Sequence, residues 1–220
     1  MIQLKRFQYL ISSGAFLSVL ALAGYFKVSY LVGSKNAFLS GTEIVSPLAG
    51  WFGGLWCVGG LFLGRYLLSG LSIMAFLLRR LPGLCGALCW GTTNRIVRVG
   101  IPVGCMILFH LHPIGRMVSP YTWYWFIPII VYGIRSTSVF GLSLANTFVS
   151  HAVGSVVWLY TMPMAAEYWW FLIPVVAVER CVIASCMAGL VKISAFIQLK
   201  LRMNRTLRYS GHRIRSTHTI

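Results

Sequence analysis

Long apolar segments separated by short polar segments make up most of the chain. Residues 7–26 contain no charged side chain, and residues 45–63 form a second apolar segment after a polar connection. A helix needs about 20 consecutive apolar residues to cross the hydrocarbon core of a bilayer. The small residues near the end of the first segment are followed by more apolar chain, which is not typical of a cleaved signal peptide. We therefore predict that residues 7–26 form a retained membrane-spanning helix.

Further apolar segments follow the first two. They are residues 66–78, 81–91, 99–111, 121–134, 140–160 and 171–193. Arg79, Arg80 and Pro82 interrupt the region 66–91, which predicts either one kinked span or an interfacial segment followed by a short helix. The aromatic start of 121–134 is typical of a belt at the membrane interface. The pattern predicts about six spans, with five to seven allowed.

The fold class that follows is all-α, with a polytopic transmembrane helical bundle over residues 1–193. Residues 194–220 form a basic tail that contains no acidic residue. Its lysine and arginines are Lys200, Arg202, Arg205, Arg208, Arg213 and Arg215. Cytoplasmic segments carry an excess of Lys and Arg, so this tail and the early Lys5 and Arg6 predict that both termini are cytoplasmic. An even number of spans follows.

Composition and charge narrow the range of partners. The mean hydropathy is +0.78, and 10% of the residues are charged, against about a quarter in soluble domains. The net charge of +16 comes from basic residues between the apolar segments and in the tail. This distribution favours anionic lipid, and we expect no nucleic-acid partner. The tail is expected to lie against lipid in the cell (inner) membrane; an exposed end or a protein-docking surface are the alternatives.

A polar stripe runs through residues 143–158 of an otherwise apolar helix. Its members recur at spacings of three and four and are Ser143, Asn146, Thr147, Ser150, His151, Gly154 and Ser155. Such a stripe should point into the bundle. One interpretation is packing, because small and hydroxylated residues let helices approach and hydrogen-bond. The other is a substrate pocket in which Asn146 and His151 supply directional hydrogen bonds.

Two further ionisable residues are candidates for a ligand site. Arg116 lies next to His110 and His112 around a Pro-Gly turn and would bind a negative group, although snorkelling to phosphate headgroups is the alternative. The two histidines would diverge on a helix, so a metal pair is not expected. Glu179 lies within an apolar segment and needs a partner.

The neighbour of Glu179 in sequence is Arg180. Adjacent helical residues diverge by about 100°, so we do not expect these two to pair. His151, Arg116 or Arg65 would then meet Glu179, either as a structural clasp or as a site for a cation or proton. The candidate ligand-binding residues are therefore Arg116, Asn146, His151 and Glu179.

No catalytic signature is found. The chain lacks a Gly-x-x-x-x-Gly-Lys phosphate loop, a Gly-x-Ser-x-Gly elbow, a His-Glu-x-x-His pair and any Asp. Cys85 and Cys89 are four residues apart and have no second Cys or His pair nearby, so we expect no metal site. We predict neither enzymatic activity nor a cofactor.

Residues 44–64, IVSPLAGWFGGLWCVGGLFLG, resemble the Pro-Leu-x-Gly-x-x-x-Gly-x-x-x-Gly second-helix pattern of S components, the substrate-binding membrane subunits of energy-coupling-factor vitamin transporters. The chain length and the basic ends are also similar. The resemblance implies a six-helix bundle that works with coupling and ATPase subunits. For the small-xxx-small docking pattern on the first helix, Gly14 and Ser18 are the candidates. No vitamin-specific motif is found, so the resemblance implies no particular ligand.

The sequence therefore predicts an integral membrane small-molecule uptake component. It would bind a polar ligand within the bundle and rely on other subunits for energy. The alternative is a structural or assembly subunit that transports nothing, in which the same polar residues only lock helices together.

Overall fold

The computed structural model describes residues 42–216, and all regular secondary structure in this range is helical. The elements in chain order are α2 (Thr42–Val45), η2 (Ser46–Leu48), α3 (Ala49–Ser69), α4 (Ile73–Gly91), η3 (Ile96–Gly100), α5 (Ile101–Leu111), α6 (Pro113–Met117), η4 (Ser119–Trp125), α7 (Phe126–Gly133), α8 (Val139–Thr161) and α9 (Ala166–Ser216). The prediction of an all-α fold is confirmed for this part of the chain.

Four of these helical segments are long and apolar enough to cross a membrane. They are Ser46–Ser69, Ile73–Gly91, Val139–Thr161 and Ala166–Lys200, and Ile96–Leu111 is a shorter apolar helix. The predicted span at residues 7–26, with Gly14 and Ser18, lies outside the described residues. The membrane class of the protein is therefore supported by four candidate spans, whereas the total of six is not confirmed.

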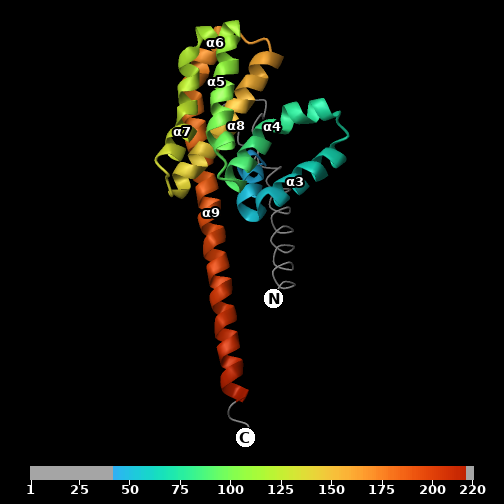
Figure 1. The fold of residues 1–220 in the computed structure, drawn as a ribbon, viewed down its shortest axis with the longest axis vertical. Coiled ribbons are helices and arrows are strands. Elements are labelled where there is room, and N and C mark those ends of the chain that lie inside the picture. The colour runs from blue at the N-terminus through green and yellow to red at the C-terminus, as the bar shows by residue number, and fades with distance from the viewer. Residues whose placement is uncertain (1–41, 217–220) are drawn as a thin grey trace.

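The helices form a bundle with a hairpin at its side (Figure 1). α5, α7, α8 and the first part of α9 lie together, whereas α3 and α4 form a hairpin that projects from this group, and α9 extends well beyond it. α8 is the most enclosed of the candidate spans, with 61% of its most apolar window buried. Its Asn146 is 1% exposed and its His151 is 9% exposed. The prediction that the polar stripe points inward is confirmed.

The hairpin resolves the region 66–91 in a way that neither sequence interpretation anticipated. α3 continues past Arg65 to Ser69 and ends where Gly70 adopts a left-handed conformation, with φ 61°, which glycine adopts without steric cost. α4 then runs without interruption through Arg79, Arg80 and Pro82. The break between the two helices therefore lies at the glycine, and the two arginines are part of a helix.

Ser72 begins α4 as its N-cap, because its hydroxyl accepts a hydrogen bond from the backbone N–H of Ala75 at 3.3 Å. Replacing Ser72 with alanine is expected to lower the free energy of unfolding by about 1 kcal/mol, since that N–H loses its acceptor. Replacement of Ser72 with glycine is expected to lower the free energy of unfolding by only a few tenths of a kcal/mol. Unfolding curves of both variants in detergent check this, and equal losses for the two would contradict the capping role.

Close approach of α3 to α4 depends on one glycine in particular. A Cβ atom added to Gly50 would lie 1.9 Å from the carbonyl oxygen of Ala87 and 2.5 Å from the backbone nitrogen of Gly91. Gly59 and Gly60 have nothing within 4 Å of the same position. The glycine-rich segment therefore permits close helix packing at its start, whereas these two later glycines face open space.

The prediction of an interfacial aromatic belt in residues 121–134 is wrong in part. The segment forms η4 followed by the eight-residue α7 and is not among the candidate spans. Tyr121 and Trp125 are buried, and both pack against the ring of Phe109. Trp169 of α9 also packs against Phe109 in this cluster. These rings fill the core between η4, α5 and α9.

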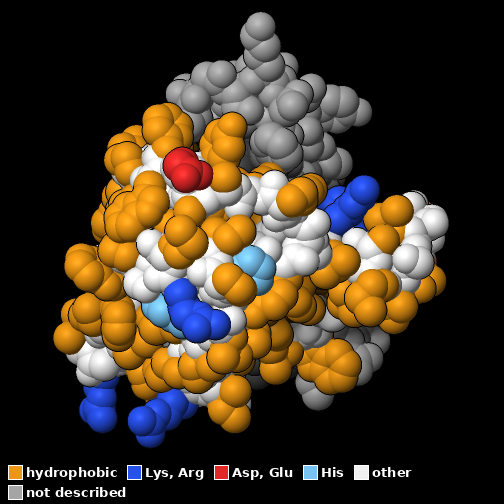
Figure 2. All heavy atoms as spheres, turned by 90° about the horizontal axis from the view of Figure 1, so that it is seen from above, with side chains coloured by type: hydrophobic (Ala, Val, Ile, Leu, Met, Phe, Trp, Pro, Cys, Tyr) orange, Lys and Arg blue, Asp and Glu red, His pale blue; other side chains and the backbone are white. Residues whose placement is uncertain are grey.

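α9 is one continuous helix of 51 residues, about 76 Å long at 1.5 Å per residue. Residues 194–216, which the sequence separates as a basic tail, continue this helix without a break in the backbone. Much of the molecular surface is apolar, and Figure 2 shows hydrophobic side chains over most of the face seen along the long axis. Large apolar residues such as Trp56, 93% exposed, and Leu68, 89% exposed, suit contact with lipid tails.

Candidate functional site

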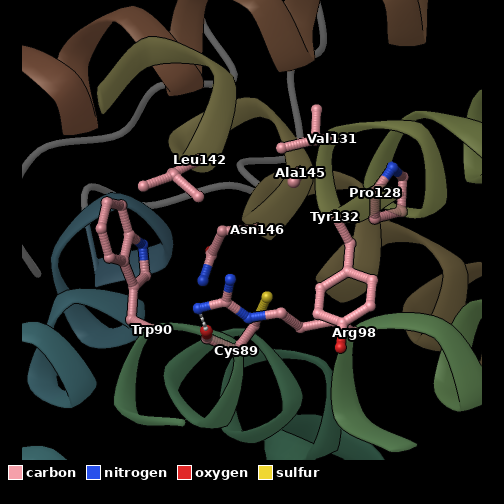
Figure 3. Close-up of a pocket in the computed structure, with 9 residues that line it drawn as sticks. All are labelled: Cys89, Trp90, Arg98, Pro128, Val131, Tyr132, Leu142, Ala145 and Asn146. Carbon is pink, nitrogen blue, oxygen red and sulfur yellow. Dashed lines mark hydrogen bonds between the residues drawn. The ribbon is translucent and has the colours of Figure 1, made fainter. Parts of the chain in front are cut away.

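A small pocket lies where α4, η3, α7 and α8 meet (Figure 3). Its lining residues are Cys89, Trp90, Arg98, Pro128, Val131, Tyr132, Leu142, Ala145 and Asn146. Two walls come from the long helices α4 and α8. The others come from η3, a five-residue π-helix, and the short α7. π-helical turns occur frequently at functional sites, and irregular backbone at membrane depth is tolerated where it is buried in protein or lines a cavity.

Arg98 supplies the charge in this pocket. Its Nε donates a hydrogen bond to the carbonyl oxygen of Thr92 at 3.1 Å, and its Nη2 donates to the carbonyl oxygen of Cys89 at 3.2 Å. The two bonds tie the guanidinium to the end of α4 and use fewer than half of its donor hydrogens. Arg98 forms no ion pair within the described part of the chain.

Asn146 joins the pocket to the packing of α8 on α4. Its Nδ2 donates a hydrogen bond to the carbonyl oxygen of Gly86. A Cβ at Gly86 would meet the hydroxyl oxygen of Ser150 at 2.2 Å and Oδ1 of Asn146 at 3.2 Å. The glycine therefore lets α8 place its amide and hydroxyl directly against the α4 backbone, as the packing interpretation of the stripe predicts.

Buried polar atoms around this contact lack hydrogen-bond partners. Within the described residues, they include Nε1 of Trp90, Oδ1 of Asn146 and the hydroxyl oxygen of Ser150. Buried polar groups are nearly always satisfied by protein or water. The pocket offers about 20 Å³ to water-sized molecules, which is room for one water. A larger ligand would have to displace the walls.

A second polar group lies between η4, α8 and α9. The hydroxyl of Tyr121 hydrogen-bonds to the hydroxyl of Ser155 at 3.2 Å, and the Ser155 hydroxyl lies 3.5 Å from Nε2 of His151. The ring of His151 also lies 5.5 Å from that of Tyr121, between centroids. The charge of Arg180 acts on both residues. His151 is therefore enclosed by aromatic rings and by a short hydrogen-bonded chain.

The partner of Glu179 is its neighbour in sequence. Nη2 of Arg180 lies 3.3 Å from Oε2 of Glu179, and the two side chains are 12% and 11% exposed. The expectation that these adjacent residues do not pair is therefore wrong, because long side chains can close the angle between their positions on the helix. In the described part of the chain, Oε1 of Glu179 and Nε of Arg180 have no hydrogen-bond partner.

Arg116 lies apart from these groups, exposed on the short helix α6. In the same region, Nδ1 of His110 donates to the carbonyl oxygen of Met106 at 2.8 Å, and the ring of His112 packs 5.1 Å from that of Tyr160. Among the residues described, no cluster of three His, Cys, Asp or Glu side chains is placed to hold a metal ion.

The structure therefore distributes the four sequence candidates over three places. Asn146 lies at the pocket, His151 lies close to the charged Glu179–Arg180 pair, and Arg116 is at the surface. The hydropathy pattern does not single out Arg98, because residues 92–98 fall between the apolar segments 81–91 and 99–111. The available signal was an isolated cation between Val97 and Val99.

Comparisons with known proteins return no relative. No family model matches the chain, and neither a curated protein nor a solved structure is similar to it.

Proposed function

We propose that the protein is an integral membrane subunit for the uptake of a small polar solute, with its binding site in the pocket between α4, η3, α7 and α8. One observation carries this proposal: Arg98, which forms no ion pair with the described residues, lines a pocket inside an apolar bundle. A charge at membrane depth is costly, and such residues commonly mark ligand or ion pathways. The π-helical turn that carries Arg98 is a second feature typical of functional sites.

The membrane arrangement that we propose has six spans. The four candidate spans, the shorter helix Ile96–Leu111 and the apolar segment 7–26 would supply them. An even number is consistent with a cytoplasmic location of both the early Lys5 and Arg6 and the basic C-terminal segment. The cell membrane is the proposed location.

The energy for uptake is proposed to come from other subunits, because the sequence carries no phosphate-binding loop. The resemblance of residues 44–64 to S components motivates the expected partners, a coupling subunit and ATPases. Affinity purification of the full-length chain from its native membrane in mild detergent tests this. Co-purification of an ATPase with a second membrane protein is expected, and its absence under conditions that preserve other membrane complexes would count against it.

A structural or assembly role is the second candidate function, and specific contacts favour it. The bond from Asn146 to Gly86 joins α8 to α4 without any ligand, and the Glu179–Arg180 pair neutralises two charges within α9. The room for a single water also suits a packed interface.

Thermal unfolding of the purified protein with a panel of polar solutes separates the two functions. A solute that binds the folded state raises the unfolding temperature by mass action. The uptake proposal expects a saturable increase with at least one solute. A purely structural subunit would show none across the panel.

A further inference from the structure

The charge balance of the pocket indicates what kind of ligand it takes. Arg98 forms no ion pair with any side chain that the structure describes, and the acidic side chains of α9 do not line the pocket. Both hydrogen bonds that Arg98 donates to described residues go to neutral backbone carbonyls. A guanidinium in a largely apolar pocket is stabilised most by an anion that can accept two parallel N–H bonds. The pocket supplies the cation of such a pair and no counter-charge.

Two other side chains of the pocket can donate hydrogen bonds. Figure 3 shows the amide nitrogen of Asn146 and the indole nitrogen of Trp90 directed toward the guanidinium of Arg98. Nε1 of Trp90 is buried and has no hydrogen-bond partner among the residues that the structure describes, and an indole N–H can only donate. The Asn146 amide carries a second hydrogen besides the one bonded to Gly86. Three donor groups therefore surround a space that needs an acceptor.

We infer that this pocket binds an oxyanion group, a carboxylate or a phosphate, held by Arg98 with Trp90 and Asn146. This inference rests on the proposed function and names the ligand class of the same site. The remaining lining is apolar and includes Pro128, Val131 and Leu142, so the rest of the ligand packs against hydrocarbon. The free space in the pocket admits about one water, so binding of an oxyanion group requires the side chains that line the pocket to move apart.

The oxyanion could come from a soluble solute or from a lipid headgroup, because both present the same acceptor oxygens. The test uses the full-length protein in nanodiscs of phosphatidylcholine, which carry no net charge. The soluble probes are acetate against acetamide, benzoate against benzamide, and inorganic phosphate against chloride at matched ionic strength. The lipid arm replaces a third of the phosphatidylcholine with phosphatidylglycerol.

The oxyanion of each pair is expected to raise the unfolding temperature, by about 4 °C at roughly ten times its dissociation constant, whereas the matched amide, or chloride, does not. Arg98→Gln should abolish the shift, and Arg98→Lys should weaken it, because lysine lacks the planar fork. Arg95→Gln is the matched control. Arg95 is exposed three positions earlier and does not line the pocket, so the shift should persist.

Other outcomes separate the inference from the proposed function. Equal shifts with amide and carboxylate, or a full shift in Arg98→Gln, would overturn the oxyanion assignment and leave a solute site in place. No shift with any soluble probe or with phosphatidylglycerol would overturn the assignment outright. An Arg98-dependent shift with phosphatidylglycerol alone would support oxyanion binding and count against solute uptake.

Discussion

Replacing Gly50 with alanine is expected to lower the free energy of unfolding by about 3 kcal/mol, at the upper end of overpacking effects. The added Cβ would lie 1.9 Å from the carbonyl oxygen of Ala87 and 2.5 Å from the nitrogen of Gly91. Both atoms are backbone, so no side-chain rotation relieves the clash and α3 must move away from α4. Unfolding in detergent, by temperature or by titration with a denaturing detergent, measures the loss.

The matched control is Gly60→Ala in the same helix. Its Cβ would meet nothing within 4 Å, and alanine is the better helix former by up to about 1 kcal/mol. The control is therefore expected to be neutral or slightly stabilising. Similar destabilisation by the two substitutions would contradict the close approach of α3 and α4 at Gly50.

Removing one charge from the Glu179–Arg180 pair is expected to lower the free energy of unfolding by about as much as Gly50→Ala does. Glu179→Gln leaves the guanidinium of Arg180 with no carboxylate at a site where both side chains are nearly 90% buried. Breaking a buried pair by removing one partner costs about 3 kcal/mol or more, because an uncompensated charge stays in a medium of low dielectric. The midpoint of unfolding in detergent should fall accordingly.

The double variant Glu179→Gln with Arg180→Gln removes both charges and is expected to be close to the parent in stability. The difference between the single and the double variant measures the cost of the orphaned charge. Equal stability of the single and the double variant would contradict this, because it would mean that the Arg180 guanidinium is solvated and does not need the Glu179 carboxylate.

The sequence allowed a correct prediction of the inward face of α8. Ser143, Asn146 and Ser150 stand at helical spacing among apolar residues, and a polar group is costly against lipid, so burial is the only low-energy placement. The pattern could not predict which residues each of these side chains contacts. The bond of Asn146 to Gly86 depends on how α4 crosses α8, and that crossing is set by many packing contacts at once.

Residues 121–134 and Arg98 could not be interpreted from hydropathy for a related reason. Hydropathy reports apolar content, and a core aromatic such as Trp125 has the same content as one at a lipid interface. The isolated charge of Arg98 likewise looks like the edge of a loop until α7 and α8 cover it. The pairing of Glu179 with Arg180 was missed because backbone geometry alone ignores the reach of long side chains.

The continuity of α9 gives the helix a mechanical property. About 24 residues separate Lys192, at the end of the apolar stretch, from Ser216, and they extend about 36 Å. If this length stays rigid, tilting the span by about 10° sweeps the far end through about 6 Å. A small tilt of α9 around the Glu179–Arg180 pair would thus move the C-terminal end of the helix through a larger distance.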